Sequence, residues 1–337
     1  MFKKIEECLK NAIKNTQNLI IFRNPNEDFF NLMIDDDPDG NQEFVINSFD
    51  NQQKETIKTN KIIRITEEEL SQIQLTIDWN HNQKNDAISY EDYINLIEKT
   101  TKTLQETTID KIVISRTEYI EDELNVWQSL VALHRAYPFA FVYFFYSSSH
   151  SAWIGATPEL LLNKENNVLK TVSLAGTKDK SANWTSKEYE EQNVVTEFIT
   201  DKLDEFGTVS VDGPHTVDAG FFHHLKSFIT LDVQDKIISE LILQSLHPTP
   251  AVCGMPKEDA KNFILNNEGY NREFYSGYLG LKNQESETYF VNLRCAQIFD
   301  NRIKLYVGGG IMADSSPQNE WNETQLKAKT LRSYLSN

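Results

Sequence analysis

Residues 291–327 read VNLRCAQIFDNRIKLYVGGGIMADSSPQNEWNETQLK, and they combine residue types suited to binding an anion and a metal. Apolar runs at Tyr289–Ile298 and Ile303–Val307 predict two strands. Pro317 after Ser316 predicts the start of a last helix, because proline is favoured at the first helical position. An arginine, three consecutive glycines and two glutamates one helical turn apart follow one another here. Such parts can hold a small, multiply charged anion beside a divalent metal.

Each of these parts also has an ordinary structural interpretation. Gly308-Gly309-Gly310 either forms a turn that needs positive φ or lets backbone N–H groups approach a carboxylate closely. Arg294, on the preceding predicted strand, is either an exposed edge residue or a bidentate carboxylate ligand. Glu320 and Glu323, with Lys327 one turn further on, form either a solvated helix face or a source of hard oxygen ligands for Mg²⁺.

Upstream of residue 291, short apolar runs alternate with helical patterns. The spacing predicts a helix over 89–107, a strand from Lys111 to Arg116, a helix over 123–137 and an aromatic strand over 139–146. Neither βαβ periodicity nor an internal repeat is visible, and several strand pairs have hairpin spacing. The pattern predicts an α+β fold with mixed or antiparallel sheets in preference to a doubly wound parallel sheet.

A further helix is indicated from Ser186 onwards. Thr185 and Glu188 have the spacing of a capping box, and an apolar stripe follows as far as Leu203. Glu191 falls on or beside this inward stripe. It is either a boundary acid that reaches water or, with acids from the last helix, a ligand for Mg²⁺.

Two titratable residues adjoin predicted strands. Lys111 opens a strand whose next residues are apolar, so burial would lower its pKa towards that of a general base, whereas a lysine at a strand end more often reaches solvent. Glu159 follows Pro158 among apolar neighbours. It is either held protonated as a general acid or exposed in a turn.

The composition limits the classes of partner. Fifty acidic against 33 basic residues give a formal net charge of −17. Such an acidic chain has no electrostatic reason to bind nucleic acid or an anionic membrane surface. Three cysteines without metal-ligand or disulfide spacing fit a reducing cytosol. We therefore expect a cytoplasmic protein without a signal peptide or a membrane span.

Taken in order, seven segments resemble the chorismate-utilising enzymes, a family that includes isochorismate, anthranilate, aminodeoxychorismate and salicylate synthases. The resemblance runs from about Lys111 to Leu335; it leaves 1–100 as a divergent N-terminal part and 101–337 as the catalytic region of a single domain. It implies large antiparallel sheets packed face to face with helices outside. The segments are KIVISR (111–116), GATPELLL (155–162), LAGT (174–177), HPTPAVCG (247–254), RCA (294–296), YVGGGI (306–311) and EWNET (320–324).

Within the family, two segments are most similar to isochorismate synthases. HPTPAVCG stands where amidotransferase-coupled members usually have a glycine-rich segment. Ala175 stands where aminodeoxychorismate synthases carry a nucleophilic lysine. The resemblance therefore favours attack by water over a covalent adduct.

The resemblance implies a Mg²⁺-dependent isomerisation of chorismate, in which water attacks C2 and the C4 hydroxyl departs. Lys111 would be the general base and Glu159 the general acid. Glu191 and Glu323 would hold the metal, with Glu320 as a further acid at or near it. The residues expected to bind the substrate are Gly176, Thr177, His224, Arg294, Tyr306, Gly308, Gly310 and Lys327.

We thus expect a monomeric isochorismate synthase that serves menaquinone or siderophore biosynthesis. The alternatives are a salicylate synthase, which also eliminates pyruvate, and anthranilate synthase component I. A catalytically inactive binding subunit is a third, which the presence of Lys111, Glu159, Glu191 and Glu323 argues against. Many family members have a richer acid–histidine cluster around the glutamate that corresponds to Glu191. The neighbours of Glu191 differ from that cluster, so the resemblance implies the identity of the metal but not its affinity.

Overall fold

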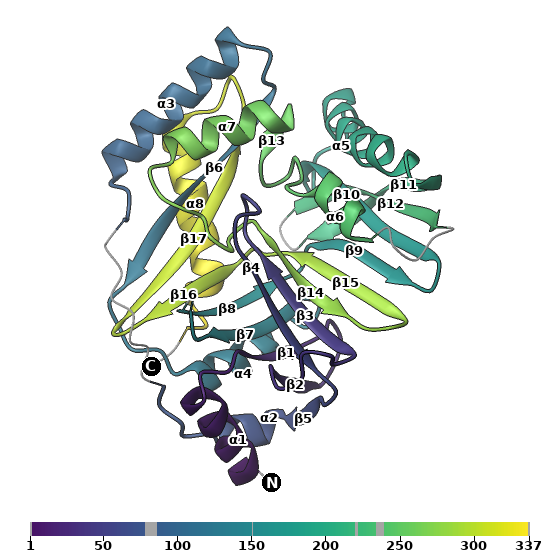
Figure 1. The fold of residues 1–337 in the computed structure, drawn as a ribbon. Helices are drawn as coiled ribbons and strands as arrows, with labels where there is room; N and C mark the ends of the chain where they lie inside the picture. Colours follow the sequence, from purple (N-terminus) through teal and green to yellow (C-terminus); the bar gives the residue numbers. More distant parts are fainter. Residues whose placement is uncertain (1, 78–85, 150, 220–221, 234–238, 336–337) are drawn as a thin grey trace.

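The chain forms two large antiparallel sheets with a hydrophobic core between them and helices outside (Figure 1). The computed structural model describes residues 2–77, 86–149, 151–219, 222–233 and 239–335. Within these residues, nine strands form one sheet and eight form the other. Neighbouring strands run antiparallel throughout both sheets. The predicted α+β class is confirmed.

Both sheets contain strands from the first hundred residues. The nine-stranded sheet has the spatial order β13 (Gly254–Met255), β6 (Lys111–Ile120), β17 (Arg302–Ile311), β16 (Cys295–Phe299), β8 (Ser151–Thr157), β7 (Phe141–Ser147), β1 (Leu19–Arg23), β2 (Phe29–Ile34) and β5 (Ile63–Thr66). The eight-stranded sheet has the order β11 (Gly207–Ala219), β12 (Phe222–Val233), β10 (Val168–Asp179), β9 (Leu160–Glu165), β15 (Ser286–Val291), β14 (Tyr278–Lys282), β3 (Gln42–Asn47) and β4 (Lys54–Thr59).

The helices fall into three groups around the sheets (Figure 1). One group packs on the nine-stranded sheet below β1 and β7: α1 (Phe2–Lys14), α2 (Glu67–Ser71) and α4 (Val126–Ala136). A second packs on the eight-stranded sheet: α5 (Ser186–Asp204) and α6 (Ser239–Leu246). The third gathers around β6 and β17: α3 (Tyr90–Glu106), α7 (Lys257–Asn267) and α8 (Pro317–Arg332). None of the helices in the described ranges is long and apolar enough to cross a membrane.

Side-chain alternation along β17 explains how one strand serves two cores. Ile303 and Leu305 pack into the cluster under the outer helices. Tyr306 lies in the aromatic core between the sheets, where its ring stacks on Trp153 at a centroid distance of 5.2 Å. Because successive strand residues point to opposite faces, both faces of β17 are buried along this part. This buried part of β17 therefore fixes the position from which its C-terminal residues extend.

One expectation about the closing stretch was wrong, and one of the two interpretations of its glycines does not hold. Arg294 does not lie on a strand: residues 292–294 link β15 to β16, and Arg294 has φ of 46°, a left-handed conformation that interrupts the predicted strand over 289–298. Gly308–Gly310 do not form a turn either. They continue β17 to Ile311 and pair with β6, with Gly310 opposite Val113.

Candidate active site

Along the C-terminal half of β17, the described strand pairing covers only one of its two edges. β6 pairs with β17 from residue 303 to 311, whereas the described pairing with β16 covers only 302–305. The Gly308 carbonyl accepts a hydrogen bond from Lys327 Nζ at 3.0 Å. The backbone N–H of Gly308 points to the same side as its carbonyl, and so does that of Gly310, two residues further on. This open edge of β17, formed by Gly308 and Gly310, can donate two N–H groups to an anion.

Two cations stand beside the open edge. Continuing the β16–β17 register would place Arg294 opposite Val307, where the ladder stops. The Arg294 carbonyl accepts from Ala156 N at 3.1 Å, so its backbone is anchored while its side chain remains exposed. Lys327 on α8 contacts both Gly308 and Glu323, the latter at 2.7 Å. Cationic side chains next to backbone N–H groups are suited to carboxylates.

The glycines of β17 allow charged side chains to approach from both faces. A Cβ on Gly309 would stand 3.2 Å from Glu320 Oε2 and 3.9 Å from Glu323 Oε1, both on α8. A Cβ on Gly310 would stand 2.6 Å from Lys111 Cε, on the other face. Glycine is thus needed here for close approach and not for a turn.

We predict that Gly310→Ala lowers kcat by at least about tenfold without unfolding the protein, because misplacing a reacting group by about 1 Å is costly. The added methyl group would overlap the Lys111 side chain, whose flexible end can move aside. Steady-state kinetics and a thermal melt of the same preparation check this. A variant with wild-type kcat would show that the Lys111 position is not critical.

Lys111 begins β6 and has the electrostatic setting of a base. Burial lowers the pKa of Lys111 below that of a free lysine. Lys327 acts in the same direction, whereas Glu191, Glu159 and Glu323 oppose the change. These three acids therefore lie close enough for their charges to act on the ammonium group. A lysine with a lowered pKa is neutral over a wider pH range, as a general base must be.

Glu159 lies between β8 and β9 and has the opposite setting. Burial raises the pKa of Glu159, and the nearby charges of Lys111 and Arg294 only partly offset this. Its carbonyl accepts from Val291 N at 2.9 Å, which ties the segment to the end of β15. Glu159 therefore retains its proton to a higher pH than a free carboxyl group, as a general acid must.

The two glutamates of α8 form the acidic side of the site. Glu320 and Glu323 both face Gly309, and burial raises the pKa of Glu320. Among the described residues, Glu320 Oε2 is buried without a hydrogen-bond partner. A buried, unpartnered carboxylate oxygen beside a second carboxylate is suited to a divalent cation. The described residues nevertheless contain no cluster of three acidic, histidine or cysteine side chains in metal-binding geometry.

Helix α5 places Glu191 where its charge acts on Lys111. The predicted capping box is confirmed, since Glu188 accepts from Thr185 N at 2.8 Å. Of the two predicted positions, on or beside the inward stripe, Glu191 takes the second: it is exposed, and Gln192 is the buried residue, accepting from Ala175 N at 2.7 Å. The helix therefore turns Glu191 away from its own core, on the side where its charge acts on Lys111.

Gly176 permits the close contact between β10 and α5. It has φ of 70° at a β-bulge, and a Cβ there would stand 2.8 Å from the Glu188 carbonyl. Next to the bulge, Thr177 pairs with His224 of β12 in the backbone register. These three predicted residues are therefore brought together on the eight-stranded sheet.

Tyr306 is the predicted residue whose placement fits substrate binding least. It is 2% exposed, and its hydroxyl donates to Gln297 Oε1 at 2.8 Å inside the core. Its ring also stacks on Tyr275 at 5.3 Å. The structure thus uses Tyr306 to pack the two sheets and does not turn its hydroxyl to the open edge of β17.

Sequence reasoning missed the positions of Tyr275, beside Gly308, and of His247, in the core. The Tyr275 hydroxyl lies 3.0 Å from where a Cβ on Gly308 would stand, and no local pattern indicates this. His247 is buried, and its Nε2 lies 3.2 Å from the carbonyl oxygens of Ser48 and Phe49. Burial lowers the pKa of His247 to about 4, so this histidine is neutral and ties the catalytic region to the first hundred residues.

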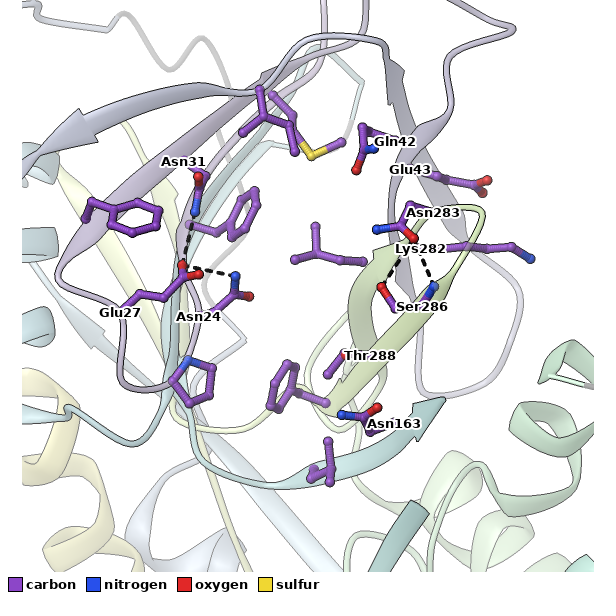
Figure 2. Close-up of a pocket in the computed structure, with 18 of the residues that line it drawn as sticks. Asn24, Glu27, Asn31, Gln42, Glu43, Asn163, Lys282, Asn283, Ser286 and Thr288 are labelled. Carbon is purple, nitrogen blue, oxygen red and sulfur yellow. Dashed lines mark hydrogen bonds between the residues drawn. The ribbon is translucent and has the colours of Figure 1, made fainter. Parts of the chain in front are cut away.

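A separate cavity of about 600 Å³ lies between the sheets, next to β2 and β14 (Figure 2). At one side of it, Asn24 and Asn31 donate to Glu27 at 3.1 and 3.2 Å. None of the predicted catalytic, metal-binding or substrate-binding residues lines this cavity. Pro158 and Leu160, on either side of the predicted acid, do. The charged cluster around the open edge of β17 is the better candidate for chemistry.

Comparison with known proteins identifies the family to which this site belongs. The family model of the chorismate-binding enzymes matches residues 38–336, and the chain therefore belongs to this family. Isochorismate synthase MenF of Escherichia coli (strain K12) is 32% identical over 260 residues, which are 72% of this chain and 60% of that protein. Isochorismate synthase DhbC of Bacillus subtilis (strain 168) is 29% identical over 265 residues, 72% of this chain and 67% of that protein.

Solved structures show the same fold. The menaquinone-specific isochorismate synthase MenF from Escherichia coli has a TM-score of 0.82 at 22% identity, covering 96% of this chain and 90% of that chain. Anthranilate synthase component I from Streptococcus pneumoniae TIGR4 has a TM-score of 0.71 at 17% identity, covering 94% and 92%. The fold is thus shared by relatives named for different reactions, so the reaction has to be inferred from the site.

Proposed function

We propose that the protein is an isochorismate synthase, which converts chorismate to isochorismate. The observation that carries this proposal is the pair formed by Lys111, with a lowered pKa, and Glu159, with a raised pKa, near a strand edge suited to carboxylates. Opposed pKa shifts of this kind mark a base and an acid in one site. Chorismate has two carboxylates, and its isomerisation requires removal of a proton from the water that attacks one ring carbon and donation of a proton to the hydroxyl that leaves another.

In the proposed reaction, neutral Lys111 takes a proton from water as the water oxygen bonds to C2 of the ring. The ring double bonds shift, and the bond from C4 to its hydroxyl oxygen breaks. Glu159 gives its proton to that oxygen, which leaves as water. One water molecule enters and one leaves, so the atoms balance. Both residues then return to their starting protonation states by exchange with solvent.

The remaining site residues would hold the dianionic substrate. The Gly308 and Gly310 N–H groups, Arg294 and Lys327 would bind carboxylates at the open edge of β17. A Mg²⁺ ion held by Glu323 and Glu191, with Glu320 beside it, would neutralise a substrate carboxylate. Gly176, Thr177 and His224, which lie together on the eight-stranded sheet, would also contact the substrate.

Product analysis tests the proposal. Purified protein is incubated with chorismate and Mg²⁺, and the products are separated by chromatography. We expect isochorismate without pyruvate. Formation of pyruvate with fluorescent salicylate would make the protein a salicylate synthase, and ammonia-dependent anthranilate would overturn the proposal. Relatives include menaquinone-specific and vibriobactin-specific enzymes. We infer that the product feeds menaquinone or siderophore biosynthesis.

We predict that Glu320→Gln raises the Mg²⁺ concentration needed for half-maximal activity by about tenfold or more, as loss of a group near a metal typically does. Glu320 Oε2 is buried without a hydrogen-bond partner in the described part of the chain, and an amide there would attract a cation less strongly because it carries no negative charge. A Mg²⁺ titration of activity, together with calorimetric Mg²⁺ binding in the absence of substrate, measures the effect. Glu98→Gln, at an exposed glutamate of α3, is the control. Unchanged Mg²⁺ dependence of the Glu320 variant would exclude this role.

A further inference from the structure

The outer edge of β6 is bound by two buried side chains where its neighbouring strand ends. β13 has only two residues and pairs with Lys111 and Ile112. Beyond it, Arg272 Nη2 donates to the Val113 carbonyl at 2.7 Å. Glu268 Oε1 accepts from Ser115 N at 2.7 Å. The two side chains thus make the hydrogen bonds that a longer β13 would otherwise make, and they satisfy backbone groups that would be costly to leave unpaired.

Glu268 and Arg272 also bond to each other and to the surrounding segments. Arg272 Nε donates to Glu268 Oε2 at 2.7 Å, and both residues are at most 5% exposed. Arg272 Nη1 donates to the Val252 carbonyl at 2.9 Å. The Tyr270 hydroxyl lies 2.6 Å from Ser115 Oγ. The ion pair therefore connects β6 with the segment after α7 and with the HPTPAVCG segment.

The anchored part of β6 follows the proposed base, Lys111, in the strand and pairs with the anion-binding edge of β17. Val113 is two residues from Lys111, so both side chains point to the same face. Ser115 is directly opposite Gly308, and Val113 is opposite Gly310. A shift of β6 at Val113 or Ser115 would therefore move the Lys111 amine relative to the N–H groups of the open edge. Displacement by about 1 Å is enough to lower a rate strongly.

We propose that Glu268 and Arg272 are positioning residues, which hold β6 so that the Lys111 amine and the Gly308 edge keep the spacing that the reaction needs. This inference rests on the proposed function, because it takes Lys111 as the base. Neither residue touches the substrate in this proposal. An ion pair that contributed only to stability would show the same contacts. Its removal, however, would leave the rate of the chemical step unchanged in the protein that remains folded.

The double variant Glu268→Gln/Arg272→Met separates positioning from stability. Removing one partner of a buried ion pair leaves an uncompensated charge, whereas replacing both is often tolerated. The glutamine side chain of this variant can still accept from Ser115 N, while the Val113 and Val252 carbonyls lose their donor. We expect folded protein with kcat reduced at least about tenfold and KM for chorismate within about twofold. The solvent deuterium isotope effect on kcat should increase, because proton transfer to Lys111 becomes slower.

The isotope effect is a ratio measured on one preparation, so partial unfolding does not change it. Lys164→Met/Glu287→Gln is the matched control: this buried pair, 3.7 Å apart, lies on β9 and β15 of the other sheet. It should keep kcat and the isotope effect. If the Glu268/Arg272 variant behaves like this control, the inference is overturned. If it fails to fold, Arg272→Lys keeps the positive charge beside Glu268 but cannot make both hydrogen bonds of the guanidinium group to the Val113 and Val252 carbonyls. That variant should still show a larger isotope effect, and an unchanged value overturns the inference.

The base assignment is tested separately with Lys111→Ala. Full activity of Lys111→Ala would refute the proposed base, and the positioning role with it. An inactive Lys111→Ala together with a fully active Glu268/Arg272 variant would refute the positioning role alone.

Discussion

Replacing Lys111 with alanine is expected to lower kcat by about 10²–10⁴-fold, the usual contribution of general acid–base catalysis, and to leave the protein folded. Lys111 is the first residue of β6, and its side chain lies against Gly310 without a described salt bridge, so its removal should not disrupt the sheet. Initial rates of isochorismate formation give kcat, and circular dichroism with a thermal melt checks the fold. Wild-type kcat in this variant would refute Lys111 as the base.

Lys111→Arg is the sharper companion variant. Arginine keeps the positive charge but stays protonated in proteins, so it cannot accept a proton from water. If Lys111 acts as a base, Lys111→Arg should be as inactive as Lys111→Ala. If Lys111 instead serves as a cation for a carboxylate, Lys111→Arg should keep much of the activity.

The strands and helices were largely predictable because their local signals agree with the fold. The strand from Lys111 and the helices starting at Ser186 and Pro317 are present as expected, each with a clear apolar period or capping residue. Local signals failed at Arg294. Its left-handed φ of 46° is imposed by the link between the two sheets, and nothing in the Leu293-Arg294-Cys295 sequence indicates it.

The candidate site was predictable only where residue chemistry and family resemblance coincided. The resemblance pointed to Lys111 and Glu159, and the structure adds the opposed pKa shifts that burial produces. Contacts between distant segments could not be predicted. Glu268 and Arg272 have ordinary i,i+4 spacing on the sequence, and only the short β13 shows that they replace a strand along β6. Helical periodicity likewise could not decide between Glu191 and Gln192 as the buried residue.

Glu159→Gln is expected to lower kcat by a similar factor, about 10²–10⁴-fold, and also to change the shape of the pH profile. In the wild-type enzyme the active form has neutral Lys111 and protonated Glu159, which gives a bell-shaped dependence of kcat on pH. The rate falls on the acid side as Lys111 becomes protonated and on the alkaline side as Glu159 loses its proton. Burial lowers the pKa of Lys111 and raises the pKa of Glu159, so the two changes bring more enzyme into the active form.

In Glu159→Gln only Lys111 still titrates, so the residual rate should rise with pH to a plateau and should not decline again. The negative charge of an ionised Glu159 raises the pKa of Lys111. Because glutamine carries no charge, the rising part of the pH profile should lie at a lower pH than the pKa that Lys111 has beside ionised Glu159. Glutamine has nearly the same size as glutamate, so the backbone hydrogen bond from Val291 N to residue 159 should be preserved. Glu165→Gln, at the exposed end of β9, is the control and should keep the bell shape. An alkaline decline that persists in Glu159→Gln would assign the acid to another residue.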